Sequence, residues 1–346
     1  MLLVNLGTPD EPSAPALRRY LAEFLTDPRV VEIPRLVWWP ILHGIILRTR
    51  PAKSAAKYAS VWMPEGSPLA VWTQRQTLAV AEQLQARGHD VLVRHAMRYG
   101  NPGLPAVLDA LRAEGATRVL VLPMYPQYAA ATTASISDRV LGWACSARRM
   151  PELRFVAEYH DDPGYIAALA EQVQAHWLAN GRADKLVLSF HGVPHRSLLL
   201  GDPYHCQCHK TARLLAAALG AAPDTILVTF QSRFGKAKWL EPYTEPTLCE
   251  LAAQGVGRVD VMCPGFVADC LETLEEIAQE ARDAFIEAGG KEFRYIACMN
   301  DSPYWIDALT TLAERHLQGW DTRGAHHDEA EAAAQRERAL AMGATD

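Results

Sequence analysis

The feature that most constrains this chain is the alternation of short, β-branched apolar runs with amphipathic stretches from end to end. The runs that predict strands are residues 2–6, 91–97, 118–123, 153–157, 185–190, 225–230, 258–263 and 293–297. The stretches between them have helical periodicity, as at 14–26, 69–86, 163–179, 205–219, 269–287 and 304–316. Strands that alternate with helices in this way predict parallel sheets joined by right-handed crossovers.

Four such strands fall in each half of the 346 residues, which are enough for two domains that each bury a core. We therefore expect an α/β protein with two similar Rossmann-like domains, each a four-stranded parallel sheet flanked by helices. The predicted limits are 1–160 and 161–320, followed by a tail at 321–346. No sequence repeat with a fixed period is visible, so the likeness of the halves is architectural.

Composition and motifs exclude several classes of function. The net charge is −6 and no basic block occurs, which argues against a nucleic acid as partner. Neither a dinucleotide-binding glycine motif nor a P-loop follows any predicted strand. The seven cysteines are scattered, the first residues do not resemble a signal peptide, and no apolar run reaches the length of a membrane span. We expect a reducing, cytoplasmic setting.

Residues 36–47 form a strongly apolar segment that a proline, a histidine and a glycine interrupt. One interpretation is a helix buried between the domains. The other is a lip beside the active site that touches a membrane, with Trp38 and Trp39 at the lipid–water boundary and Arg35 and Arg48 near the headgroups.

His191 follows the predicted strand 185–190 directly, and Gly192 and Pro194 shape a tight loop after it. Ligands of parallel sheets bind beyond the carboxyl ends of the strands, so an imidazole here is placed to face a cleft. The alternative is a histidine that only satisfies a backbone carbonyl.

A second predicted strand, 258–263, leads into an acidic helix. Glu272, Glu276 and Glu280 recur four residues apart and stack on one face, and the helix offers no lysine to pair with them. Three unpaired carboxylates suit a hard cation. Asp269 and Glu272 also fit a capping box, so a capped and solvated helix face is the alternative.

His191 and Glu272 therefore leave separate strand ends of the same predicted sheet and can meet across one cleft. Imidazole and carboxylate together can hold Fe²⁺ loosely and leave coordination positions open. Either group can also accept a proton near neutral pH.

These two motifs identify a family. His191-Gly-Val-Pro after Leu-Ser-Phe, and the run from Cys263 to Glu276, resemble the signatures of bacterial-type ferrochelatases. The likeness covers roughly residues 2–320. It extends to Asn5-Leu6-Gly7-Thr8-Pro9, Gly66-Ser67-Pro68-Leu69, Met97-Arg98-Tyr99, Tyr125-Pro126-Gln127-Tyr128 and Thr229-Phe230-Gln231-Ser232-Arg233.

The resemblance implies a class II chelatase fold with a porphyrin between the domains. It implies insertion of Fe²⁺ into protoporphyrin IX with release of two protons, which gives protohaem in the last step of haem biosynthesis. By the same resemblance, His191 and Glu272 are catalytic, and they bind the metal together with Glu276 and Glu280. The implied porphyrin-binding residues are Leu6, Arg98, Tyr99, Tyr125, Ser232 and Trp239.

We expect no tightly bound cofactor, because Fe²⁺ is a substrate in this family. Animal-type members carry a [2Fe–2S] cluster with one ligand in the Tyr-Pro-Gln-Tyr segment and three near the C-terminus. The matching position here is Ala130, and no cysteine follows Cys298, so such a cluster is not expected.

The segment His205-Cys206-Gln207-Cys208-His209 is a separate question. Structural zinc prefers two to four residues between cysteines and four ligands in all, so the spacing is poor. We expect both thiols to be dispensable, while a metal or another kind of cluster at this segment stays open.

Two alternatives to iron insertion stay open from sequence. One is a cobalt or nickel chelatase that acts on a related tetrapyrrole. The other is a haem- or metallophore-binding protein without turnover. Binding proteins of that kind are usually exported, and the first residues do not resemble a signal peptide. We expect this protein in the cytoplasm, or at the periphery of the inner membrane if 36–47 touches lipid.

Overall fold

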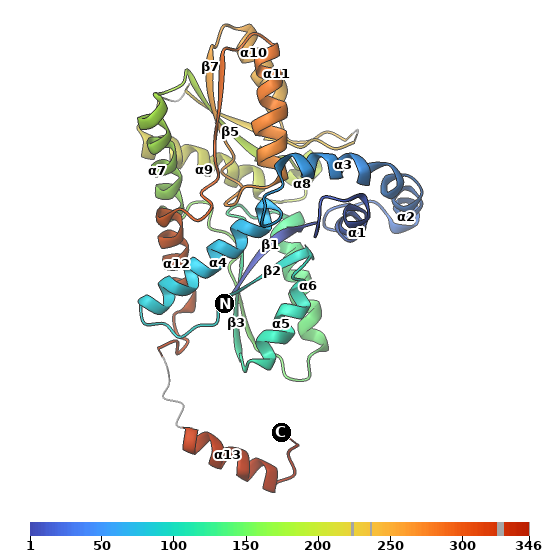
Figure 1. Ribbon diagram of the computed structural model, residues 1–346, viewed down its shortest axis with the longest axis vertical. Coiled ribbons are helices and arrows are strands. Elements are labelled where there is room, and N and C mark those ends of the chain that lie inside the picture. Colours follow the sequence, from blue (N-terminus) through green and yellow to red (C-terminus); the bar gives the residue numbers. More distant parts are fainter. Residues whose placement is uncertain (223–224, 236, 324–328, 346) are drawn as a thin grey trace.

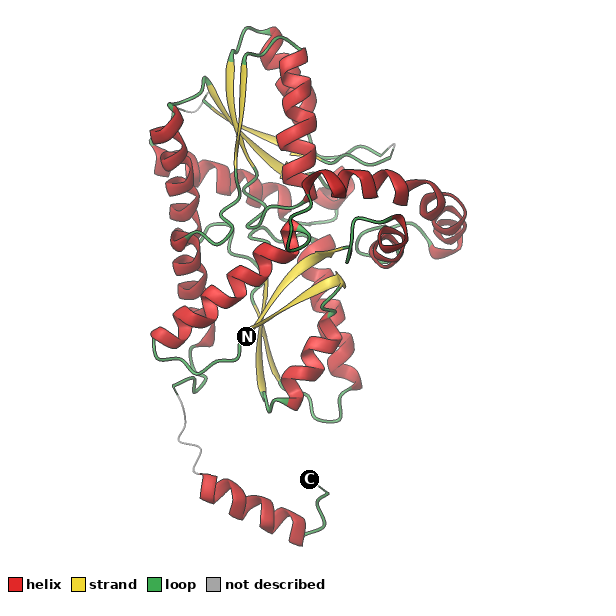
Figure 2. Cartoon of the chain, viewed as in Figure 1, coloured by secondary structure: helices red, strands yellow, loops and turns green. Residues whose placement is uncertain are grey.

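The computed structural model describes residues 1–222, 225–235, 237–323 and 329–345, and it contains two four-stranded parallel sheets (Figures 1 and 2). The first sheet has the order β2-β1-β3-β4, with β1 at Leu2–Thr8, β2 at Arg94–Gly100, β3 at Arg118–Pro123 and β4 at Glu152–Phe155. The second has the order β6-β5-β7-β8, with β5 at Lys185–His191, β6 at Ile226–Gln231, β7 at Arg258–Met262 and β8 at Glu292–Ile296. The two sheets share one topology, which confirms the predicted fold class.

In the first sheet, alternate side chains face two helical layers. Leu3 of β1 belongs to a core with α4 (Pro68–Ala86), whereas Leu2 and Val4 pack with α5 (Leu104–Ala113) and α6 (Ser135–Ser146). Both faces are therefore covered, as a parallel sheet requires, and the central strands β1 and β3 are mostly apolar for that reason.

The second sheet repeats this arrangement. Leu188 of β5 faces α7 (Pro163–Asn180) and α9 (Tyr204–Leu219). Val187 faces the opposite layer, formed by α10 (Thr244–Ala253), the π-helix η3 (Glu272–Ala281) and α11 (Arg282–Glu287). The site described below lies on this second layer, at the carboxyl ends of the strands.

Helix α12 (Pro303–Leu317) joins the halves, because it packs against both α7 and α4. Its Trp305 is fully buried beside Tyr159 and Tyr165, so one apolar core runs from one face of the first sheet to one face of the second. The domain limits near 160 and 320 remain a proposal. In the tail, α13 spans Glu329–Ala341, while residues 324–328 and 346 lie outside the described residues.

Four helical elements project from the first sheet and contain the apolar segment (Figure 1). We call α2 (Arg35–Ile41) and the π-helix η1 (Leu42–Ile46) the lip; they lie between α1 (Ala14–Leu25) and α3 (Leu47–Val61). Among the residues that the structure describes, no helix has the length and apolar character needed to cross a bilayer.

The prediction that Trp38 lies at a lipid boundary is wrong. Its side chain is only 7% exposed, its indole donates to the Leu25 carbonyl at 2.7 Å, and it packs with Leu42 and Leu47. Trp39 is 55% exposed and points the other way. Successive residues of a helix face different directions, so adjacent tryptophans cannot share one environment.

Candidate active site

His191 is the last residue of β5 and pairs in register with Gln231 at the end of β6. Its Nδ1 lies 2.7 Å from the carbonyl oxygen of Gly192. A carbonyl only accepts, so Nδ1 carries a hydrogen, and in the neutral ring Nε2 is the nitrogen with the lone pair. The backbone contact considered as the alternative role therefore exists, and it orients the ring with Nε2 as the acceptor for a proton or a metal.

Gly192 allows the close approach that positions this imidazole. A Cβ at Gly192 would lie 2.6 Å from the Gln231 carbonyl oxygen and 3.2 Å from the Trp239 ring, so only glycine fits. The indole N–H of Trp239 is buried and meets no acceptor among the described residues. A buried donor without a partner is costly, and a bound substrate can supply the missing acceptor.

Helix η3 begins at Glu272, and its N-cap residue, Leu271, makes no side-chain capping hydrogen bond. The capping-box alternative is thus wrong. Asp269 is buried and instead accepts hydrogen bonds from Thr273 at 3.0 Å, Tyr295 at 2.6 Å and Asn300 at 2.7 Å. This network fixes the turn before the π-helix, a rare element that is often found at functional sites.

The Glu276 carboxylate is held by the residues that end β6. It accepts from the Ser232 backbone N–H at 2.6 Å and from the Gln231 side chain at 3.2 Å, and Gln231 also donates to the Glu272 carbonyl at 2.8 Å. Burial raises the pKa of Glu276. Hydrogen bonds from Ser232, and the charge interaction with the nearby His191, oppose this increase. The structure thus places Glu276 close enough to His191 for their charges to interact.

The raised pKa of Glu276 predicts how stability changes with pH. The folded protein binds this proton more tightly than the unfolded chain, so this carboxyl makes folding less favourable as pH rises above its ordinary value of 4.5. Glu276→Gln removes that effect and should gain free energy of unfolding, relative to the unaltered protein, between pH 4.5 and neutrality. Urea unfolding at a series of pH values measures the difference.

Ser232→Ala is the matched control, because it deletes a donor that lowers the pKa of Glu276. Its stability should fall more steeply over the same pH range. Equal slopes for all three proteins would contradict the assigned environment of Glu276.

Glu280 is not an unpaired carboxylate, so that prediction is wrong. Lys57 of α3 donates to Glu280 at 2.7 Å and to Glu275 at 3.0 Å. The lysine lies more than 200 residues away in sequence, and no pattern within the acidic helix could reveal it. Glu280 therefore joins η3 to α3 in this conformation.

Glu272 faces the first half of the chain, where three phenols gather. Burial raises the pKa of Tyr20, Tyr58 and Tyr125 well above 10, and the nearby charge of Glu272 adds to each increase. The Cys270 thiol is buried and also interacts with Glu272. The Glu272 carboxylate thus points away from the second sheet, towards these residues from the first half of the chain.

Arg98 and Tyr99 are held by Asp27 and Ser135. The Arg98 guanidinium pairs with Asp27 and donates to the Ser135 hydroxyl at 2.7 Å, and the Tyr99 hydroxyl donates to Asp27 at 2.8 Å. Burial alone would raise the pKa of Asp27, but hydrogen bonds from Ser135, from the Arg29 backbone and from Tyr99, together with the Arg98 charge, lower it. The Tyr99 backbone also touches Gly7, where a Cβ would lie 1.8 Å from the Tyr99 oxygen.

The sequence-predicted residues thus form two groups that meet at η3. Leu6 donates its N–H to the Tyr125 hydroxyl at 2.9 Å, and Tyr99 lies near this pair. Ser232 and Trp239 lie on the His191 side. Sequence reasoning missed the contacts of Asp27, Lys57 and Tyr20, which join segments remote in the chain. Within the described residues, no three His, Cys, Asp or Glu side chains are arranged to hold a metal together.

Comparison with known proteins decides the family. The model of the family described as ferrochelatase matches residues 1–317. The chain belongs to the ferrochelatase family. It is 68% identical over 344 residues to a ferrochelatase of Methylibium petroleiphilum, covering 99% of this chain and 94% of that one. A ferrochelatase of Azoarcus is 61% identical over 346 residues, covering 100% and 95%.

A solved structure shows the same fold at low identity. SirB from Bacillus subtilis with Fe³⁺ aligns with a TM-score of 0.52 and 15% identity, covering 70% of this chain and 89% of SirB. For this member of the ferrochelatase family, the match supports the two-sheet architecture alone. The roles of individual side chains depend on the geometry given above.

Proposed function

We propose that this protein inserts Fe²⁺ into protoporphyrin IX and releases two protons, which gives protohaem as the last step of haem biosynthesis. Membership of the ferrochelatase family supports this activity, a lyase reaction that forms nitrogen–metal bonds. The geometry that supports it best is the orientation of His191, whose Nδ1–H is bound to a carbonyl while Nε2 can accept a proton beside Glu276.

The reaction itself sets what these residues must do. In a flat porphyrin the two pyrrole N–H groups point inward, and the nitrogen lone pairs are poorly presented to an incoming ion. A protein that grips a bent macrocycle favours the shape of the transition state over the flat ground state. Fe²⁺ then enters from one face as the two protons leave.

We assign His191 as the proton acceptor and Glu272 as the guide for the metal. His191 has a lone pair on Nε2, and Glu272 presents a charge at the meeting of the two halves. Glu276 supports His191 electrostatically. Glu280 can join the other two glutamates in binding the metal only after its contact with Lys57 is broken. The proposed mechanism needs no tightly bound cofactor and no [2Fe–2S] cluster.

The proposed porphyrin-binding residues have unequal roles. The unpaired indole N–H of Trp239 is a donor for an acceptor on the substrate. Arg98 suits a propionate, because its fork donates two parallel hydrogen bonds, but it must first exchange Asp27 for that group. Tyr99 and Tyr125 are proposed to contact the macrocycle through their large, flat, apolar rings.

An oxygen-free assay of metal and porphyrin preference tests this function. The pure protein is mixed with protoporphyrin IX or coproporphyrin and with Fe²⁺, Co²⁺ or Ni²⁺, and the absorption spectrum is followed. Rapid appearance of the haem spectrum with Fe²⁺ and protoporphyrin IX is expected. Turnover with only Co²⁺ or Ni²⁺ would instead favour the alternative chelatase.

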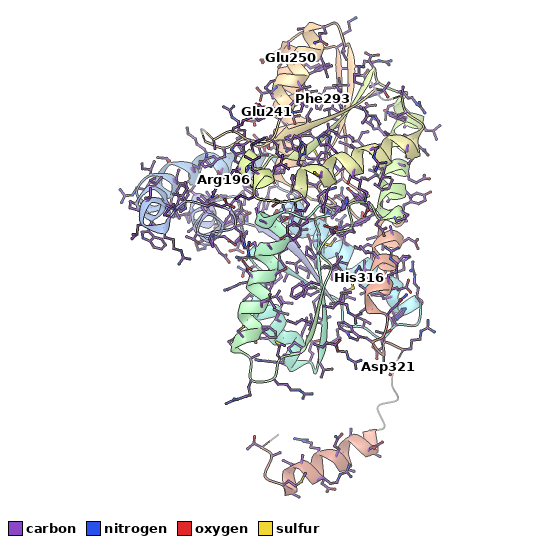
Figure 3. All side chains as sticks on the ribbon, turned by 180° about the vertical axis from the view of Figure 1, so that it is seen from behind. Arg196, Glu241, Glu250, Phe293, His316 and Asp321 are labelled. Carbon is purple, nitrogen blue, oxygen red and sulfur yellow. The ribbon has the colours of Figure 1, made fainter. Side chains whose placement is uncertain are left out.

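We also propose that the lip makes peripheral contact with the inner membrane from the cytoplasmic side. Leu36 is 92% exposed, Trp39 and Ile45 are also exposed, and Arg35 and Arg48 flank them on the surface. Large apolar side chains that face water beside cations are typical of membrane-surface helices. Glu32, which precedes the lip in sequence, pairs with Arg196 at 2.9 Å. Arg196 belongs to α8 (His195–Leu199) and is labelled in Figure 3.

The variant Leu36→Ser/Trp39→Ser should lose most of its binding to anionic liposomes. Burying one large apolar side chain contributes about 1.5–3 kcal/mol, so removing two should weaken binding by at least about a hundredfold. Trp38 is left intact because it belongs to the core. Co-sedimentation with liposomes measures the effect, and Met150→Ser, which alters an exposed apolar residue outside the lip, is the control. Unchanged binding by the folded double variant would refute the contact.

A further inference from the structure

The segment 205–209 opens α9, the helix that covers the face of the second sheet opposite to η3. The structure separates its two thiols. Cys206 is exposed, whereas Cys208 is fully buried, and burial raises the pKa of Cys208 well above 9. A buried, protonated thiol is a poor ligand, so the two cysteines cannot share a metal ion.

The two histidines that flank these thiols come together instead. His205 and His209 are one helical turn apart, and their ring centroids are 4.5 Å apart at an interplanar angle of 57°. The Phe230 ring lies 5.9 Å from His205, nearly parallel to it, and 6.2 Å from His209. Because Phe230 is itself buried, it is a rigid floor that restricts how far either imidazole can move.

We propose that His205 and His209 form a binding site for a borderline divalent transition metal such as Zn²⁺, separate from the porphyrin site. Two histidines at this spacing on one helix face bind zinc in many enzymes, and imidazole is a preferred ligand for Zn²⁺, Cu²⁺ and Ni²⁺. Zinc hydrolases of this pattern carry a glutamate directly after the first histidine. This chain has Cys206 there, so the site binds metal without the base needed for hydrolysis.

The surroundings of the pair leave space for the other ligands of a metal ion, because His205 is half-buried and His209 is exposed. As no described cluster of three His, Cys, Asp or Glu side chains has the geometry of a metal centre, water completes the coordination.

The sheet separates this pair from the proposed catalytic residues. Leu188 and Phe190 of β5 face α9, while Val187 faces the layer that contains η3. Removing the imidazoles should therefore leave iron insertion within about twofold of normal, since neither ring touches η3 or His191.

Zinc titration by calorimetry tests the proposal in full-length protein that carries His191→Ala and Glu272→Gln, which remove two of the metal ligands proposed for the catalytic site. We expect the protein that also carries His205→Asn/His209→Asn to bind one equivalent of Zn²⁺ fewer than the protein with both histidines intact. Either single substitution should weaken that equivalent at least tenfold, because one imidazole alone loses the chelate. Cys206→Ser is the matched control on the same turn and should bind zinc normally.

Two results would overturn the proposal. One is unchanged zinc binding in the double histidine variant; the other is loss of binding in Cys206→Ser. If the double variant does not fold, the cobalt spectrum of the His191→Ala/Glu272→Gln protein decides. We expect the ligand-field bands of a nitrogen and oxygen site, and a thiolate-to-cobalt charge-transfer band would contradict it.

Discussion

His191→Ala is expected to lower kcat for iron insertion by about 100- to 10,000-fold, the usual contribution of a positioned general base. The imidazole lies at a strand end, and its hydrogen bond with the Gly192 carbonyl is local, so its loss should cost little stability. Protoporphyrin binding, followed by fluorescence, should change little. The substitution thus separates proton transfer from substrate binding.

His316→Ala provides the matched control, because this histidine lies in the last turn of α12, outside the proposed site (Figure 3). It should retain normal turnover and the same melting temperature. Near-normal turnover by the His191→Ala protein at neutral pH would remove His191 from the mechanism.

Glu272→Gln is expected to lower kcat/KM for Fe²⁺ by about 100- to 1,000-fold, the effect of deleting one preorganised electrostatic contact. Gln231 anchors the backbone carbonyl of Glu272 rather than its side chain, so the π-helix should keep its position. Glutamine preserves size and removes the charge. The KM for porphyrin should stay within a few-fold of normal.

Glu287→Gln alters an exposed glutamate at the end of α11, in the same helical run, and should leave kinetics unchanged. Glu276→Gln should be impaired as well, since Glu276 lies beside His191. A Glu272→Gln protein with an unchanged dependence on Fe²⁺ concentration would show that this carboxylate does not guide the metal.

The fold could be predicted from sequence because parallel strands leave a strong signal. Both faces are covered by helices, so the central strands are mostly apolar, and all eight predicted strands lie within three residues of the observed ones. The position of His191 follows from the same rule, since functional residues gather where such strands end. Local patterns were sufficient here because local hydrophobicity decides these elements.

Other features depend on contacts that no local pattern contains. Lys57 pairs with Glu280 across 223 residues, and Trp38 is buried because α1 supplies the Leu25 carbonyl. Asp269 looked like a helix cap, but Tyr295 and Asn300 engage it from the far end of the second sheet. The π-helix likewise has no distinctive periodicity at this length, so its acidic residues were placed as if on an ordinary α-helix.

The most direct test of the central claim counts products during many turnovers. Pure wild-type protein, a large excess of protoporphyrin IX and Fe²⁺ are mixed without oxygen in weakly buffered solution, and haem and released protons are measured together. We predict haem far in excess of protein, with two protons released for each haem. Haem that stops at one equivalent per protein, or forms no faster than without protein, would contradict iron insertion by this chain.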